Sequence, residues 1–293
     1  MSAAGRRSVA FVTHAALPAL TPDDRLAIAP LAKRGIDVVP ASWDDAQTDW
    51  RRFDLVVLRS TWDYWRRVSE FRAWLERMAC DHVRLWNPPR LALWSMEKHY
   101  LRDLEEARVP VVATRWLRRG HNTLLQAVLE ENGWDRAVIK PVISGNADGT
   151  WTTCLAAAAG DELRFRGELA ERDLMVQQFV EAIAAEGEWS LVFIGSELSH
   201  TIIKQPAPGD FRVQHDFAGT ARAARPAAAV VELAHAALAQ VPSEWLYARV
   251  DLVHAGDEYR VMELELLEPS LFMAADPERA PERLADAVAA LVR

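Results

Sequence analysis

The chain has little cysteine, and its two cysteines form no recognisable framework. Cys80 and Cys154 lie far apart in the sequence, and neither belongs to a pair with metal-ligand spacing. A disulfide-rich secreted domain and a cysteine-based zinc site are therefore excluded. We expect both residues to be ordinary core or half-buried thiols.

Long hydrophobic runs and basic blocks are also missing. No apolar stretch reaches the length of a membrane span, and the one that follows Arg6 and Arg7 is interrupted at Thr13 and His14, which favours a first strand over an export signal. The 34 basic and 42 acidic residues are interspersed and give a net charge of −8. This balance argues against nucleic acid or an anionic membrane as the main partner. We expect a cytoplasmic protein that acts on small molecules; self-association into a homo-oligomer stays open.

Half of the residues, 50%, are hydrophobic, which allows a sizeable core in a chain of 293 residues. Segment 1–90 alternates short apolar runs with segments of helical spacing. The expected strands are Ser8–Thr13, Ile36–Val39 and Leu55–Leu58, and the expected helices are Asp23–Arg34 and Val68–Met78. This βαβα order predicts a parallel sheet with helices on its faces.

The pattern changes after Asn87-Pro-Pro89, which marks the first expected boundary. Two helices come next, one from Ser95 as its N-cap to Ala107 and one at Asn122–Asn132. The later elements are strands at Ala137–Pro141, Thr150–Cys154, Leu174–Phe179, Trp189–Ile194 and Leu198–Lys204, and helices at Ala227–Ala239 and Pro277–Arg293. The predicted class is α/β, with α+β character in the later part and domains at 1–90, 91–180 and 181–293.

Two alternating stretches near the C-terminus carry three acidic residues. Leu246–His254 and Glu258–Leu266 are expected to pair as a hairpin. Because side chains alternate along a strand, Glu263 and Glu265 share a face, which Asp251 on the partner strand can join. Gathered carboxylates repel one another unless a cation lies among them, and Mg²⁺ prefers such oxygen ligands. The alternative is a solvated face of an edge hairpin.

Other segments supply cations that suit phosphate groups. Lys140 ends an apolar strand and precedes the small turn Ser144-Gly145-Asn146, whose backbone N–H groups can fold over phosphates. Lys98 lies on the helix after the proline pair. Lys204 and Arg212 flank a Pro/Gly loop, and arginine offers a planar fork for phosphate or carboxylate oxygens. Taken singly, each segment has an ordinary alternative: a hairpin turn, a solvated helix lysine or a surface loop.

The strand that ends in Gln177-Gln178-Phe179-Val180 runs into a polar linker and an acidic cluster that includes Glu188. Its backbone can meet a purine edge; the alternative is a sheet strand whose glutamines face water. In this order, the cations, the small polar loop and the acidic hairpin are what ATP-dependent phosphoryl transfer to a carboxylate requires. No Ser–His or Cys–His nucleophile pair is obvious in the sequence.

In this order the residues resemble the ATP-grasp superfamily, in particular its glutathione synthetase and RimK-like branch, over Asn87–Phe272. The resemblance implies that Lys98 and Lys140 bind phosphates and that a mobile loop contains Ser144, Gly145 and Asn146. It implies an adenine hinge made of Gln177, Gln178, Phe179 and Val180, and a ribose contact from Glu188. The resemblance further implies that two Mg²⁺ ions are held by Asp251, Glu263 and Glu265. The cations at the transferred phosphoryl group would be Lys204, Arg212 and Arg249. Glu265 departs from the branch, which has Asn there, but keeps an oxygen ligand.

The loop Arg59-Ser-Thr-Trp-Asp63-Tyr-Trp65 differs from that of glutathione synthetases. It resembles the Arg-Ser-Thr-Trp-Asp-Tyr stretch of the D-cycloserine-type ATP-grasp ligases of natural-product biosynthesis. It follows an expected parallel strand, where open α/β sheets bind ligands. Arg59 would hold the carboxylate of a zwitterionic amino acid and Asp63 its ammonium; the alternative is an Arg–Asp pair that pins the loop. The expected substrate residues are Arg59, Ser60, Asp63, Tyr64, Glu268 and Ser270.

The predicted function is ATP-dependent ligation. A carboxylate is activated as an acyl phosphate, and an amine then displaces phosphate to give an amide. The substrates are expected to be small and amino-acid-like and to belong to a biosynthetic pathway. Two alternatives stay open, a kinase that ends at phosphoryl transfer and a nucleotide-binding protein without turnover. The intact acidic triad argues against the second alternative.

Overall fold

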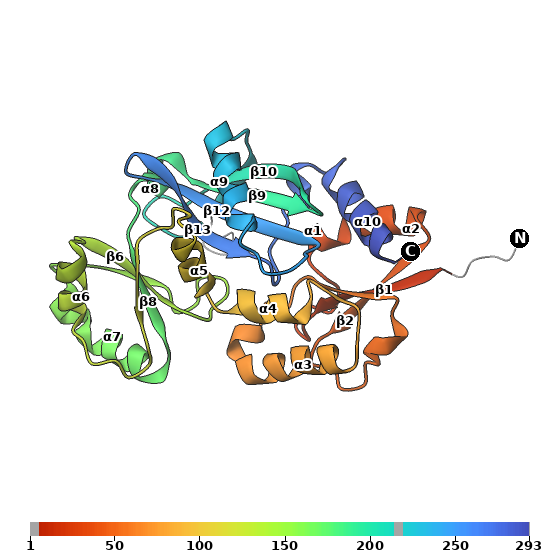
Figure 1. Cartoon of the computed structure of the whole chain (residues 1–293), viewed down its shortest axis with the longest axis horizontal. Coiled ribbons are helices and arrows are strands. Elements are labelled where there is room, and N and C mark those ends of the chain that lie inside the picture. The colour runs from red at the N-terminus through yellow and green to blue at the C-terminus, as the bar shows by residue number, and fades with distance from the viewer. Residues whose placement is uncertain (1–5, 214–218, 293) are drawn as a thin grey trace, which may run out of the picture.

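Three β-sheets follow one another along the chain in the computed structural model, which describes residues 6–213 and 219–292 (Figure 1). The first sheet is parallel, with the order β2-β1-β3-β4, and confirms the predicted α/β start. Its strands are β1 (Arg7–Thr13), β2 (Ile36–Ser42), β3 (Leu55–Leu58) and β4 (Leu85–Trp86). All four residues of β3 are buried, as expected for a central strand covered on both faces.

Helices cover both faces of this first sheet. One face packs on α2 (Ile28–Lys33) and α10 (Ala280–Leu291), and the other packs on α3 (Val68–Cys80) and α4 (Pro89–Met96). The single helix expected at Asp23–Arg34 is instead two, α1 (Pro22–Arg25) and α2. Pro30 explains the break, because it has no N–H to donate to the carbonyl of Leu26. Cys154 is half-buried as expected, whereas Cys80 is exposed.

The prediction of one helix from Ser95 to Ala107 is wrong. α4 begins at the proline pair, where the missing N–H of Pro89 costs nothing, and α5 (Tyr100–Glu106) follows after a break. Ser95 lies near the end of α4 rather than at an N-cap, and its hydroxyl accepts from the Leu266 N–H at 3.2 Å. Lys98 therefore lies in the turn between the two helices.

The second sheet is antiparallel and lies at the left of Figure 1. Its order is β5-β8-β6-β7, with strands β5 (Thr114–Leu117), β6 (Arg136–Pro141), β7 (Trp151–Cys154) and β8 (Leu174–Gln178). Buried side chains of α6 (Leu125–Asn132) and α7 (Ala158–Glu171) form one core with these strands.

The third sheet, also antiparallel, carries the predicted acidic hairpin. Its order is β11-β10-β9-β12-β13, with strands β9 (Glu188–Ile194), β10 (Glu197–Gln205), β11 (Thr220–Ala223), β12 (Tyr247–Ala255) and β13 (Glu258–Glu265). The helices α8 (Ala182–Glu186) and α9 (Ala228–Leu238) lie against it, and short 3₁₀ turns occur at Trp50–Arg52, Tyr64–Arg66 and Met273–Ala275.

The closing helix α10 returns to the beginning of the chain (Figure 1). Its buried residues share a core with β1 and α2, and Arg34 of the helix–strand connection bonds Glu282 and Asp286 at 2.7 Å each. The domain limits expected at residues 90 and 180 stay predictions. None of the helices in the described part of the chain combines the length and the apolarity needed to cross a membrane.

Candidate active site

One cavity of about 1690 Å³ opens where the three sheets meet. Its wall contains every residue that the sequence predicts for the site except Ser60. Ser60 is fully buried, and its hydroxyl donates to the Thr13 hydroxyl at 3.2 Å. Ser60 therefore lies outside the cavity wall at the end of β3, and its role in substrate binding stays a prediction.

The predicted acidic face is present at the base of the cavity. Asp251 on β12 pairs in register with Glu263 on β13, and Glu265 lies two residues further along the same strand. One oxygen from each of these three carboxylates lies within 4.8 Å of the others. A set of hard oxygen donors this close together fits Mg²⁺.

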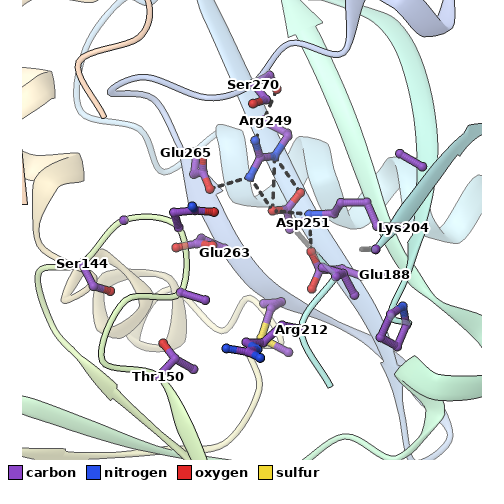
Figure 2. A pocket seen from close by; sticks show the side chains of 18 of the residues that line it. Ser144, Thr150, Glu188, Lys204, Arg212, Arg249, Asp251, Glu263, Glu265 and Ser270 are labelled. Carbon is purple, nitrogen blue, oxygen red and sulfur yellow. Dashed lines mark hydrogen bonds and ion pairs between the residues drawn. The ribbon is translucent and has the colours of Figure 1, made fainter. Parts of the chain in front are cut away.

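Buried cations already separate these carboxylates (Figure 2). The Arg249 guanidinium lies 2.9 Å from Asp251 and 2.5 Å from Glu265, and Nζ of Lys204 lies 3.2 Å from Asp251. Lys204 also pairs with Glu188. The result is a continuous row of alternating charges that runs from Glu188 to Glu265.

This row sets the protonation of its members. Burial alone would raise the pKa of Asp251, but the neighbouring Arg249 and Lys204 lower it, so Asp251 stays ionised. For Glu265 burial outweighs the attraction of Arg249 and raises the pKa to about 7. Burial likewise raises the pKa of Glu188. Sequence reasoning places Glu188 at the ribose, whereas its carboxylate here is bound to Lys204 beside the acidic triad.

Two lysines face the triad from other elements. Nζ of Lys98 lies 3.4 Å from Glu263 and donates to the backbone oxygen of Ser144 at 3.0 Å. Nζ of Lys140 donates to the Gln177 amide oxygen at 2.8 Å, and burial lowers the pKa of Lys140. Both ammonium groups thus donate to neutral oxygens that phosphate oxygens can replace, and Lys98 also contacts the Glu263 carboxylate.

The small polar turn after β6 packs against the first domain. A Cβ atom on Gly145 would lie 2.6 Å from Cδ1 of Trp65, so any other residue would force the Trp65 side chain or the loop to shift. The next residue, Asn146, has a left-handed φ of 50°. Nε1 of Trp65 donates to the backbone oxygen of Trp62, whose own Nε1 donates to the backbone oxygen of Glu268, both at 3.0 Å. These two tryptophans connect the predicted nucleotide loop to the predicted substrate loop.

The predicted adenine hinge lines the cavity, but its two glutamines differ. Gln177 is 1% exposed and bonds Lys140, so the alternative of a water-facing glutamine is wrong for it and holds for the exposed Gln178. The Phe179 ring lies 3.7 Å from the guanidinium of Arg136. Val180 is buried.

The loop after β10 brings Arg212 to the cavity. Its guanidinium bonds Asp210 at 2.8 Å and lowers the pKa of that carboxyl to about 2. Lys204, at the other end of the loop, belongs to the buried row of charges.

The structure contradicts one of the two interpretations of the substrate loop, the structural pair, because Arg59 does not pair with Asp63; the zwitterion site stays a prediction. Arg59 is 1% exposed, lies 2.8 Å from Asp24 and donates to the backbone oxygen of Pro269 at 3.0 Å. Asp63 instead accepts from Nε1 of Trp43 at 2.8 Å. Sequence reasoning misses Asp24; its signal is the Thr21-Pro22 helix start, which fixes α1 beside β3.

Tyr64 and Glu268 also reach the cavity wall, and Ser270 lies beside them. Burial raises the pKa of both Tyr64 and Glu268, and the neighbouring carboxylates raise both further. The Tyr64 phenol therefore stays protonated. The backbone oxygen of Ser270 accepts from Arg249 at 3.3 Å.

A lysine-bearing antiparallel sheet that faces a sheet with a carboxylate triad is the arrangement of the ATP-grasp fold, and solved structures match it. A RimK domain ATP-grasp protein from Sphaerobacter thermophilus matches with a TM-score of 0.70 at 21% identity, over 97% of this chain and 98% of that one. The D-alanine–D-alanine ligase from Bacillus anthracis, solved with ATP, matches with a TM-score of 0.70 at 14% identity, over 98% and 97%. These two matches show the fold.

The chain belongs to the DcsG family of ATP-grasp ligases. It is 32% identical over 262 residues to the cycloserine biosynthesis protein DcsG of Streptomyces lavendulae. The aligned region covers 81% of this chain and 83% of the relative. The crystal structure of D-cycloserine synthetase DcsG matches with a TM-score of 0.87 at 29% identity, over 98% of this chain and 100% of that one. The sequence profile of the DcsG N-terminal domain matches residues 9–87. The protein is thus an enzyme that uses ATP to form an amide, as the sequence predicts.

Proposed function

We propose that this ligase activates the carboxylate of an amino-acid-like substrate as an acyl phosphate and transfers the acyl group to a nitrogen nucleophile. The observation that carries the proposal is the single cavity in which Lys98 and Lys140 face the carboxylates Asp251, Glu263 and Glu265. The similarity to D-cycloserine synthetase supports an amino-acid-derived substrate and a role in natural-product biosynthesis. Since ATP is a substrate, we place the enzyme in the cytoplasm.

The reaction has two balanced steps. A carboxylate oxygen attacks the γ-phosphorus of ATP, the bond to the bridging oxygen breaks, and ADP leaves. The nitrogen nucleophile then attacks the acyl carbon, the bond to the phosphate oxygen breaks, and the nitrogen loses a proton. The protein contributes orientation and charge stabilisation rather than a covalent intermediate.

The cationic side chains have separate tasks in these steps. Lys98 and Lys140 neutralise the α- and β-phosphates, whose oxygens replace the contacts to Ser144 and Gln177. Arg249, Lys204 and Arg212 lie on the side of the triad and stabilise the charge on the transferred phosphoryl group and the acyl phosphate. The Gly145 loop covers the phosphates and excludes water that would hydrolyse the acyl phosphate.

Asp251, Glu263 and Glu265 would hold Mg²⁺, and we expect two ions. Bound there, magnesium would supply positive charge that stabilises the transferred phosphoryl group. Arg249 bonds Asp251 and Glu265 in the structure, so its guanidinium would have to give up these contacts for the two carboxylates to act as ligands.

The test is ADP release from the purified chain with Mg²⁺ and panels of amino acids and dipeptides, offered singly and in pairs, with mass spectrometry of the products. The proposal expects ADP and a new amide only when a carboxylate and a nitrogen nucleophile are both present, on one molecule or on two. A stable phosphorylated product without nitrogen transfer would instead indicate a kinase. Nucleotide binding without turnover would indicate a binding protein.

A further inference from the structure

An unusual group of buried polar atoms lies where α1 and the residue after β3 form part of the cavity wall. Among the described residues, six buried side-chain nitrogen or oxygen atoms have no hydrogen-bond partner, and three of them belong to Asp23, Asp24 and Arg59. These three residues all line the cavity. We call them the acceptor cluster.

Each charged member of the acceptor cluster is anchored by part of its polar group. Oδ1 of Asp24 accepts from Nε of Arg59 at 2.9 Å, and Oδ1 of Asp23 accepts from the Ala274 N–H at 2.9 Å. Nη2 of Arg59 forms an ion pair with Asp24 and donates to the backbone oxygen of Pro269. The second oxygen of each aspartate and Nη1 of Arg59 remain without a partner among the described residues. The protein therefore holds these side chains in place but leaves part of their hydrogen-bonding capacity unused.

Little of the cluster is exposed to solvent. Asp24 and Arg59 are each 1% exposed. An unpaired carboxylate oxygen that is shielded from water is costly, and a bound donor removes that cost. Asp23 is only half-buried, so its side of the cluster is the approach from the cavity.

The net charge of the acceptor cluster indicates which kind of ligand would complete its hydrogen bonds. Two adjacent aspartates share one guanidinium, which leaves an excess of one negative charge. The group that completes the cluster is therefore a cation with several N–H donors, and a primary ammonium group meets both conditions.

We propose that Asp23 and Asp24 bind the ammonium group of the amino-acid substrate, an inference that rests on the proposed ligase function. Nη1 of Arg59 then faces an oxygen atom of the same ligand. Arg59 is primarily a positioning residue, because it holds Asp24 in place.

This proposal moves the ammonium site from the residue that the sequence indicates. Asp63 already accepts from Trp43 and lies 3.9 Å from His14 and 4.0 Å from Arg67. Its surroundings supply donors and positive charge, which disfavour a further ammonium group. In each aspartate of α1, by contrast, Oδ2 has no hydrogen-bond partner among the described residues.

The test uses the full chain and measures ligand binding without turnover. The probes are the protein amino acids in both enantiomers, each compared with its α-hydroxy acid where one exists, such as alanine with lactate and serine with glycerate. Calorimetry compares the wild type with Asp23→Asn, which keeps an oxygen for the Ala274 N–H and removes the charge. Asp37→Asn is the matched control, because Asp37 is exposed on β2 and pairs only with Arg6 at the surface.

We expect an amino acid that binds the wild type to bind Asp23→Asn about tenfold to hundredfold more weakly, as for loss of a charge-assisted contact. Its hydroxy acid should bind both proteins equally weakly, and Asp37→Asn should match the wild type. Asp24→Asn should lower both affinity and melting temperature, because it also releases Arg59. The inference is wrong if no amino acid binds, if Asp23→Asn binds amino acids normally, or if the hydroxy acid binds as tightly as the amino acid.

The outcome is separable from that of the proposed function. Ammonium-dependent binding without ADP release would support the acceptor cluster and contradict the ligase. ADP release that is equally fast in Asp23→Asn would support the ligase and contradict the acceptor cluster.

Discussion

The carboxylate triad at one end of the cavity and the acceptor cluster at the other differ in how completely their charged side chains are paired. At the metal end, every carboxylate of the triad already contacts a cation: Asp251 and Glu265 contact Arg249, and Glu263 contacts Lys98. At the other end, the acceptor cluster holds polar atoms that have no partner among the described residues. Ligands at the metal end therefore exchange one set of contacts for another, whereas a ligand at the acceptor cluster adds contacts. The carboxylate triad can therefore stay charged in a stable fold without nucleotide. The acceptor cluster selects a substrate that carries the ammonium group needed to complete its contacts.

The largest expected effect is loss of turnover on removal of a metal-end carboxylate. Glu263→Ala should abolish ADP release and leave the melting temperature nearly unchanged, because Glu263 is half-buried and Lys98 keeps its contacts to Ser144. Asp251→Ala should also abolish turnover, and it should lower the free energy of unfolding, because Arg249 and Lys204 each lose one of their two carboxylate partners. Glu258→Ala, an exposed position on the same strand, is the control. Near-normal turnover of Glu263→Ala in Mg²⁺ would remove it from the site.

At the acceptor end, the largest expected effect is on stability. Arg59→Ala leaves Asp24 buried without its cation and should lower the free energy of unfolding by about 3–5 kcal/mol. Asp63→Ala should cost much less, because Asp63 is half-buried and not part of that pair. Thermal unfolding measures both. Equal losses in the two variants would mean that Arg59 and Asp63 support the loop together, which is the alternative that the sequence leaves open.

The third effect concerns nucleotide affinity. Lys140→Met should weaken ATP binding about tenfold to hundredfold, because a charge-assisted contact in a partly dehydrated cleft contributes roughly 1.5–3 kcal/mol. Amino-acid binding at the acceptor cluster should not change. Calorimetry with ATP measures the first and the amino-acid panel the second. Unchanged ATP binding would exclude Lys140 from the phosphate site.

The smallest effect tests whether the two ends are mechanically connected. Gly145→Ala places a methyl group against Trp65 and should raise the KM for ATP about threefold to tenfold, since the loop must shift by a few tenths of an ångström or more. Trp65→Ala in the same chain should restore much of the affinity by making room. Gly160→Ala, which meets open space on α7, is the control. If the Trp65→Ala change brings no recovery, the contact does not govern loop position.

Local rules predict much of this molecule. Period-two alternation places Asp251, Glu263 and Glu265 on one face, and the apolar run before Lys140 places that lysine at a strand end, as the structure has them. Chain order and composition also indicate the parallel first sheet.

What escapes prediction depends on distant contacts or on a single backbone turn. The partner of Arg59 is 35 positions away, at Asp24, and no local pattern connects them. Ser60 follows a fully buried strand, so alternation does not reveal which way its side chain faces. α7 is missed because only three of its residues, Ala158, Phe165 and Leu169, are buried, which leaves a weak periodic signal.

The most direct test of the account follows an oxygen atom between the two ends of the cavity. A substrate pair identified by ADP release is offered with ¹⁸O in both oxygens of the reacting carboxylate, and the released phosphate is analysed by mass spectrometry. Attack of that carboxylate on the γ-phosphorus predicts phosphate that carries one ¹⁸O atom for every amide formed. Amide formation with unlabelled phosphate would contradict the acyl phosphate and, with it, the division of the cavity into a substrate-holding end and a phosphoryl-transfer end.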